Sequence, residues 1–117
     1  MYEIIDRHMP HTIGIQVGGD IREEDFVQLR DEMAGVLDES APLNVVFICA
    51  EGVAMQPAVL WDDMNFIQGR AGQFGRMALV GGEEWLPMVE IVRDAGFDSR
   101  FFAHAEANAA WDWANNG

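Results

Sequence analysis

Residues 43–50, with the sequence LNVVFICA, are apolar at every position but one. A strand with one solvent-exposed face alternates apolar and polar residues, whereas a strand buried on both faces is apolar nearly throughout. This run therefore predicts a strand buried on both sides of a sheet. Such strands occur in α/β proteins, where helices pack against the sheet.

The rest of the chain alternates strands with helices. Short apolar or alternating runs predict strands, the first two joined in a hairpin, at residues 2–6, 12–17, 76–81 and 99–103. Helical spacing of apolar residues predicts helices at residues 21–40, 58–70, 83–94 and 106–114. The order ββαβαβαβα predicts an α/β fold with a mainly parallel sheet, in one domain that spans residues 1–117.

The charge of the chain argues against several kinds of partner. The formal net charge is −13, and all seven basic residues are arginine. An acidic surface repels nucleic-acid backbones, so we expect no nucleic-acid partner, and membrane association is disfavoured. Cys49 is the single cysteine, which excludes an intrachain disulfide. No apolar run reaches the roughly 18 residues of a membrane span, and we expect a cytoplasmic location.

Four motifs carry a resemblance to a known family: GGDIREEDF, LWDDMNF, ALVGGEEW and RFFAHAEANAAWDW. Their order and spacing resemble those of the SpoIIAA-like family, small bacterial domains of the STAS fold. The resemblance covers nearly the whole chain. It implies a five-stranded sheet with four helices and a distant similarity to CRAL-TRIO lipid-carrying domains, and it implies no established enzymatic activity.

Two departures from that pattern restrict what the resemblance implies. Anti-sigma-factor antagonists of this fold are phosphorylated on a serine after the third strand, but here the junction reads CAEGVAMQP and contains no hydroxyl group. A phosphoserine switch at that site is therefore excluded. The resemblance also implies a lysine that relatives often carry just after the fourth strand, where this chain has Glu83 and Glu84, and this difference argues against docking on a membrane.

The sequence offers little for catalysis. Asp62 and Asp63 are successive residues of a predicted helix, so their side chains point about 100° apart and do not converge as an acid and a base would. The three histidines lack the spacing of a metal pair, and no nucleophile motif is present. We expect no catalytic residues, no metal site and no cofactor, and we do not expect an enzyme.

The helices predicted at 58–70 and 83–94 have more apolar surface than packing on one sheet requires. One interpretation is that the two helices pack on each other. The other is that they form an apolar groove for a hydrophobic ligand or partner, with flexible methionines that include Met77. The residues predicted to line this groove are Met55, Val59, Trp61, Met64, Phe66, Trp85, Met88 and Val92.

A second, weaker sequence pattern suggests a site that binds an anion. Arg70 and Arg76 lie close together around AGQFG, and Gly81 and Gly82 occupy a strand-to-helix turn that exposes backbone N–H groups. These residues predict an anion-binding site. The alternative is that the arginines form surface ion pairs and the glycines serve the turn.

We therefore predict a non-catalytic module that binds a hydrophobic small molecule or lipid between its second and third helices. The alternative is a protein-interaction or regulatory module of the anti-sigma-factor-antagonist type without the phosphorylated serine. An enzyme of unknown reaction is the third interpretation. A homodimer is also compatible with the surplus of apolar surface.

Overall fold

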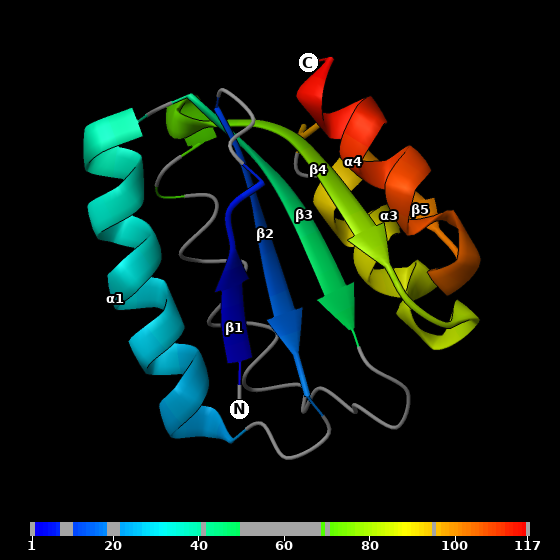
Figure 1. Ribbon diagram of the computed structural model, residues 1–117, viewed down its shortest axis with the longest axis horizontal. Helices are drawn as coiled ribbons and strands as arrows, with labels where there is room; N and C mark the ends of the chain where they lie inside the picture. The colour runs from blue at the N-terminus through cyan, green and yellow to red at the C-terminus, as the bar shows by residue number, and fades with distance from the viewer. Residues whose placement is uncertain are drawn as a thin grey trace.

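Five strands form one sheet in the computed structural model, which describes residues 2–7, 11–18, 22–40, 42–49, 69, 71–94 and 96–116 (Figure 1). The strands are β1 (Tyr2–Ile5), β2 (Thr12–Val17), β3 (Leu43–Cys49), β4 (Phe74–Val80) and β5 (Ser99–Phe102). They lie side by side in chain order; β1 is antiparallel to β2, and all the other pairs are parallel. The mainly parallel five-stranded sheet is confirmed, and its antiparallel first pair makes it a mixed sheet.

Three α-helices lie within the described residues, where the sequence predicts four in the whole chain. They are α1 (Glu23–Ser40), α3 (Leu86–Asp94) and α4 (Ala107–Asn115). Of the helix predicted at 58–70, residues 58–68 and 70 lie outside the described part. The helix predicted at 83–94 begins with a 3-10 turn, Glu83–Trp85, so that Pro87 falls in the first turn of α3, where its missing N–H group costs nothing.

None of the helices in the described ranges is long and apolar enough to cross a membrane. The longest, α1, is amphipathic and buries Phe26, Leu29, Met33 and Leu37 at helical spacing. Its start is fixed by the backbone N–H of Arg22, which donates to a carboxylate oxygen of Asp25 at 3.0 Å. This hydrogen bond lowers the pKa of Asp25.

The two faces of the sheet differ in the size of their side chains. A row of large apolar residues crosses all five strands and packs against α1 and α3: Ile4, Ile15, Phe47, Leu79 and Phe101. The neighbouring row, on the opposite face, includes smaller residues at its centre: Ile5, Gly14, Val46, Ala78 and Arg100. The α4 helix covers this second face, so that α1 and α3 share one side and α4 takes the other.

Trp111 is the main contact between α4 and the sheet. Its side chain is 1% exposed, and its ring lies directly over Gly14, where an added Cβ would come within 2.5 Å of two ring carbons. Trp113 lies on another side of α4 and packs against Phe102, with ring centroids 5.9 Å apart. The absence of a side chain at Gly14 thus allows the indole to lie close to β2.

Candidate functional site

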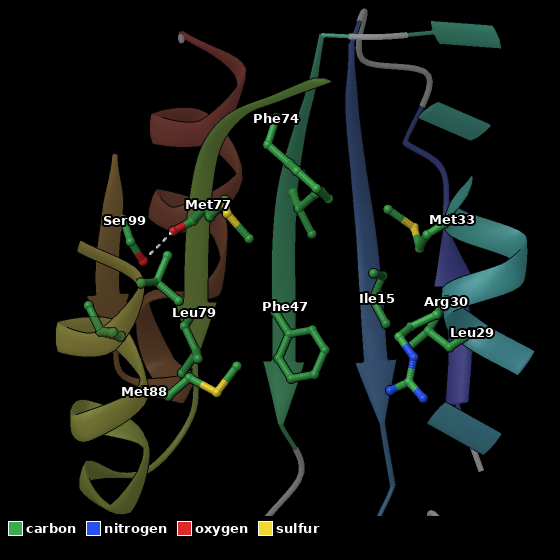
Figure 2. Close-up of a pocket in the computed structure, with 13 residues that line it drawn as sticks. Ile15, Leu29, Arg30, Met33, Phe47, Phe74, Met77, Leu79, Met88 and Ser99 are labelled. Atoms are coloured by element: carbon green, nitrogen blue, oxygen red, sulfur yellow. Dashed lines mark hydrogen bonds between the residues drawn. The ribbon is translucent and has the colours of Figure 1, made fainter. Parts of the chain in front are cut away.

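A hollow of about 90 Å³ lies on the face of the sheet that carries α1 and α3 (Figure 2). Strands β2 to β5 supply its floor, and the two helices supply its walls. The described residues that line it are Ile15, Leu29, Arg30, Met33, Val45, Phe47, Phe74, Met77, Leu79, Met88, Val89, Val92 and Ser99. Among these, Arg30 and Ser99 are the only polar side chains.

The position of the hollow follows from the strand order. Parallel strands joined in sequence by right-handed crossovers place their connecting helices on one face of the sheet. The α1 helix joins β2 to β3 and α3 joins β4 to β5, so they flank the middle of that face on opposite sides. The residues that join β3 to β4 lie mostly outside the described part, and the walls given above belong to the described residues.

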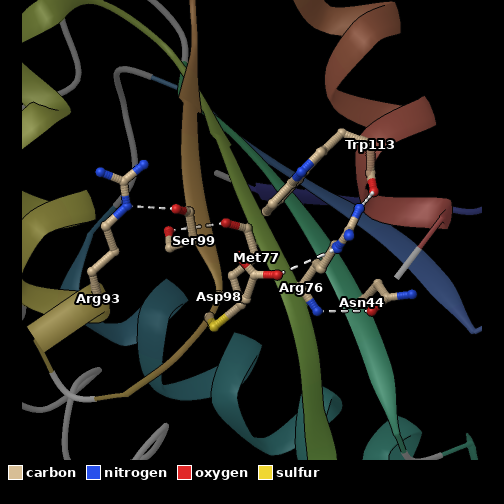
Figure 3. Close-up of polar contacts among 7 residues, drawn as sticks. All are labelled: Asn44, Arg76, Met77, Arg93, Asp98, Ser99 and Trp113. Atoms are coloured by element: carbon tan, nitrogen blue, oxygen red, sulfur yellow. Dashed lines mark hydrogen bonds and ion pairs between the residues drawn. The ribbon is translucent and has the colours of Figure 1, made fainter.

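The hydroxyl group of Ser99 is not a free nucleophile. Its Oγ donates a hydrogen bond to the carbonyl oxygen of Met77 at 2.9 Å. The backbone carbonyl of Ser99 accepts from Nε of Arg93 at 2.7 Å (Figure 3). These bonds connect α3, β5 and β4 at one end of the hollow, so the role of Ser99 within the described structure is to hold its walls together.

The structure describes three of the eight residues predicted to line the groove: Trp85, Met88 and Val92. Met88 and Val92 line the hollow, whereas Trp85 does not. Trp85 is 5% exposed and packs edge-on against Phe47, with ring centroids 6.5 Å apart. The other residues of the prediction lie outside the described part: Met55, Val59, Trp61, Met64 and Phe66. Met77, also expected nearby, lies in the floor.

The contribution of α1 to the hollow is absent from the sequence prediction. Leu29, Arg30 and Met33 form one wall, and none of the three is among the residues predicted to line the groove. The helical spacing of α1 identifies Leu29 and Met33 as buried, but it does not show that they border an opening. That result depends on which helices lie beside each other on the sheet, and this is a property of the strand order.

The described residues of the predicted anion site, Arg76, Gly81 and Gly82, are not brought together. Arg76 lies near the start of β4 and Gly81 and Gly82 follow its end, roughly 16 Å away for a strand that rises about 3.3 Å per residue. The guanidinium group of Arg76 donates to the carbonyl oxygen of Trp113 at 2.8 Å and pairs with Asp98 at 3.4 Å (Figure 3). The N–H group of Gly81 donates to the carbonyl oxygen of Phe102 at 3.1 Å. Arg70 lies outside the described residues.

The described part of the chain contains no cluster of three side chains able to hold a metal ion. His104 lies at the carboxyl end of β5, where Nε2 donates to the carbonyl oxygen of Cys49 at 2.8 Å. It is not among the residues that line the hollow. The described walls of the hollow thus supply apolar surface and one cation, rather than the paired acid and base that proton transfer uses.

A comparison with protein-family models gives a match to the model described as SpoIIAA-like, over residues 12–115. The chain belongs to the SpoIIAA-like family. The match runs from the first residue of β2 to the last residue of α4, so it includes every described wall of the hollow. SpoIIAA-like domains are of the STAS type, which makes this chain a STAS-type regulatory or binding module, in a family whose members are generally non-enzymatic. No curated protein and no solved structure matches the chain.

Proposed function

We propose that this SpoIIAA-like domain is a non-catalytic module that binds the apolar end of a small molecule or lipid in the hollow between α1 and α3. The observation that carries the proposal is the almost wholly apolar lining. Burying apolar ligand surface against such a lining gains about 25 cal/mol per Å². The volume of about 90 Å³ is smaller than the roughly 150 Å³ that holds benzene, so it suits one segment of a ligand.

The methionines of the hollow support a ligand that varies in shape. Met33 lies on α1, Met77 on β4 and Met88 on α3, so that flexible side chains meet the hollow from three elements. Methionine is unbranched and adjusts to irregular apolar surfaces. A lining of this kind accepts alkyl chains of several lengths better than a rigid aromatic pocket would.

The first test is the mass of freshly purified protein measured under native and denaturing conditions. A native mass that exceeds the chain mass by a few hundred daltons, with the excess lost on denaturation, supports a bound small molecule. Octanol is then used as a defined apolar probe for the emptied protein, with binding followed by calorimetry. Saturable binding of octanol is expected, and its absence contradicts the proposal.

The second test fills the hollow. Met88→Trp adds bulk to a half-buried residue that lines it, so octanol binding should weaken by at least tenfold. Ile91→Trp is the matched control, because Ile91 lies on the same helix but is 39% exposed and does not line the hollow. Circular dichroism establishes that both variants are folded. Equal octanol affinity in the two folded variants would place the ligand elsewhere.

The alternative function is regulatory, with the domain docked on another protein. STAS-type domains often interact with proteins, and α3 presents apolar side chains to solvent at Leu86, 40% exposed, and Ile91, 39% exposed. Large apolar side chains that face solvent add apolar surface on which a partner can dock. A doubled native mass that Ile91→Glu returns to a single chain would favour this alternative, with a second copy as the partner.

A further inference from the structure

We propose that the ligand of the hollow carries a carboxylate group and that Arg30 binds it; this inference rests on the proposed function. Arg30 is the charged side chain among the described residues that line the hollow. The other polar one, Ser99, already donates its hydroxyl hydrogen to Met77. Among the described lining residues, Arg30 is thus the one whose charge would make a negatively charged ligand bind more tightly than a neutral ligand.

The chemistry of the guanidinium group selects the ligand class. A carboxylate that approaches an apolar site loses part of its hydration, and hydrogen bonds from a partner of opposite charge offset this cost most strongly. A protein with a net charge of −13 repels anions, and a cation beside the hollow reduces that repulsion locally. The planar fork of arginine matches a carboxylate with two parallel hydrogen bonds.

The position of Arg30 fits such a role. It is half-buried on α1, beside Leu29 and one turn before Met33, both of which line the same wall. Figure 2 shows its side chain extending from α1 over β2, near Ile15. Arg30 already takes part in an interaction within the protein, but its five N–H donors allow it to bind a carboxylate as well. The ligand class is therefore an alkyl carboxylate, with the chain in the hollow and the acid group at Arg30.

The test compares octanoate with octanol, which share an alkyl chain and differ in charge, by calorimetry at neutral pH. Octanoate is expected to bind more tightly to the unaltered protein. Arg30→Gln should weaken octanoate binding by at least about tenfold, the value of one of the two charge-assisted hydrogen bonds, and should change octanol binding by a much smaller factor. Arg100→Gln is the matched control, because it removes the same charge from an exposed residue on the face covered by α4.

The outcomes separate this inference from the proposed function. If octanol and octanoate bind equally and Arg30→Gln weakens neither, Arg30 is not the acid-binding group, although the hollow still binds alkyl chains. If both arginine variants weaken octanoate equally, the effect is one of net charge, and the inference is also overturned. If neither compound binds the unaltered protein, the proposed function itself fails.

Discussion

Gly14→Ala tests whether the packing of α4 depends on the absence of one side chain. Gly14 lies on β2, directly beneath the indole of Trp111, which is 1% exposed. An alanine Cβ would lie 2.5 Å from both Cη2 and Cζ2 of that ring, and its next contact is Cβ of Ile5 at 3.4 Å. Carbon atoms in contact are normally about 3.5–4.0 Å apart, so the ring must move by about 1 Å or more.

The expected loss can be estimated from these contacts. Adding one methyl group to a filled core costs about 1–3 kcal/mol in displaced neighbours. Replacing glycine by alanine also lowers the conformational entropy of the unfolded chain, and this stabilises the folded state by about 0.4–1 kcal/mol. The difference of these ranges is about 0–2.6 kcal/mol, and because the added Cβ meets two ring carbons at 2.5 Å we expect Gly14→Ala to lower the free energy of unfolding by about 1–2.6 kcal/mol, the upper part of that range. Urea denaturation measures that change, and tryptophan fluorescence reports the movement of the indole.

Gly35→Ala is the matched control, because the same chemical change has the opposite expected sign. Gly35 is exposed in the middle of α1, and no heavy atom beyond its chain neighbours and the nearby backbone of its own helix lies within 4 Å of an added Cβ. Alanine there should raise the free energy of unfolding by about 0.5–1 kcal/mol, since glycine weakens helix interiors. If Gly14→Ala is as stable as Gly35→Ala, Trp111 does not pack on β2 as described, and the reasoning is refuted.

Two further predictions concern polar groups. Burial and a hydrogen bond to Glu32 raise the pKa of Tyr2 from 10.0 to about 12. Because the fold favours the neutral phenol, this stabilisation is complete below pH 10 and is lost as the pH rises towards 12. Tyr2 is the single tyrosine, so an absorbance titration of tyrosinate reports it directly, and Glu32→Gln should lower the midpoint; an unchanged midpoint would exclude that hydrogen bond. Asn44→Leu should cost about 1–3 kcal/mol, measured in urea, because the buried Asn44 accepts from the N–H group of Arg76 at 2.8 Å. A stability equal to that of the unaltered protein would show that this N–H group finds another partner.

The elements of the described fold could be predicted because each depends on residues close together in the chain. Apolar alternation predicts β2 over residues 12–17, and the structure has the strand at Thr12–Val17. The helix predicted at 21–40 is found at Glu23–Ser40. Periods of two and 3.6 residues are set by the local backbone, so they are legible without knowledge of the rest of the molecule.

The candidate site was predicted only in part, because it depends on distances between elements. The sequence identified Met88 and Val92 as surplus apolar residues, and both line the hollow. It also grouped Trp85 with them, although this indole is used in the core against Phe47. An apolar side chain has the same sequence pattern whether it fills the core or borders an opening, so the pattern could not separate these two uses.

The sequence by itself determined the described strands and helices, their order, the acidic charge and, through its motifs, the SpoIIAA-like family. The tertiary structure alone decided that α1 and α3 share one face, that Trp111 packs over Gly14, and that Arg30 lies in the lining of the hollow. The physical reason is that the periodicity of apolar residues depends on the local backbone. Strand order and register instead bring together residues that are far apart in the chain, and only these contacts arrange the helices, the strands and Arg30 around the hollow.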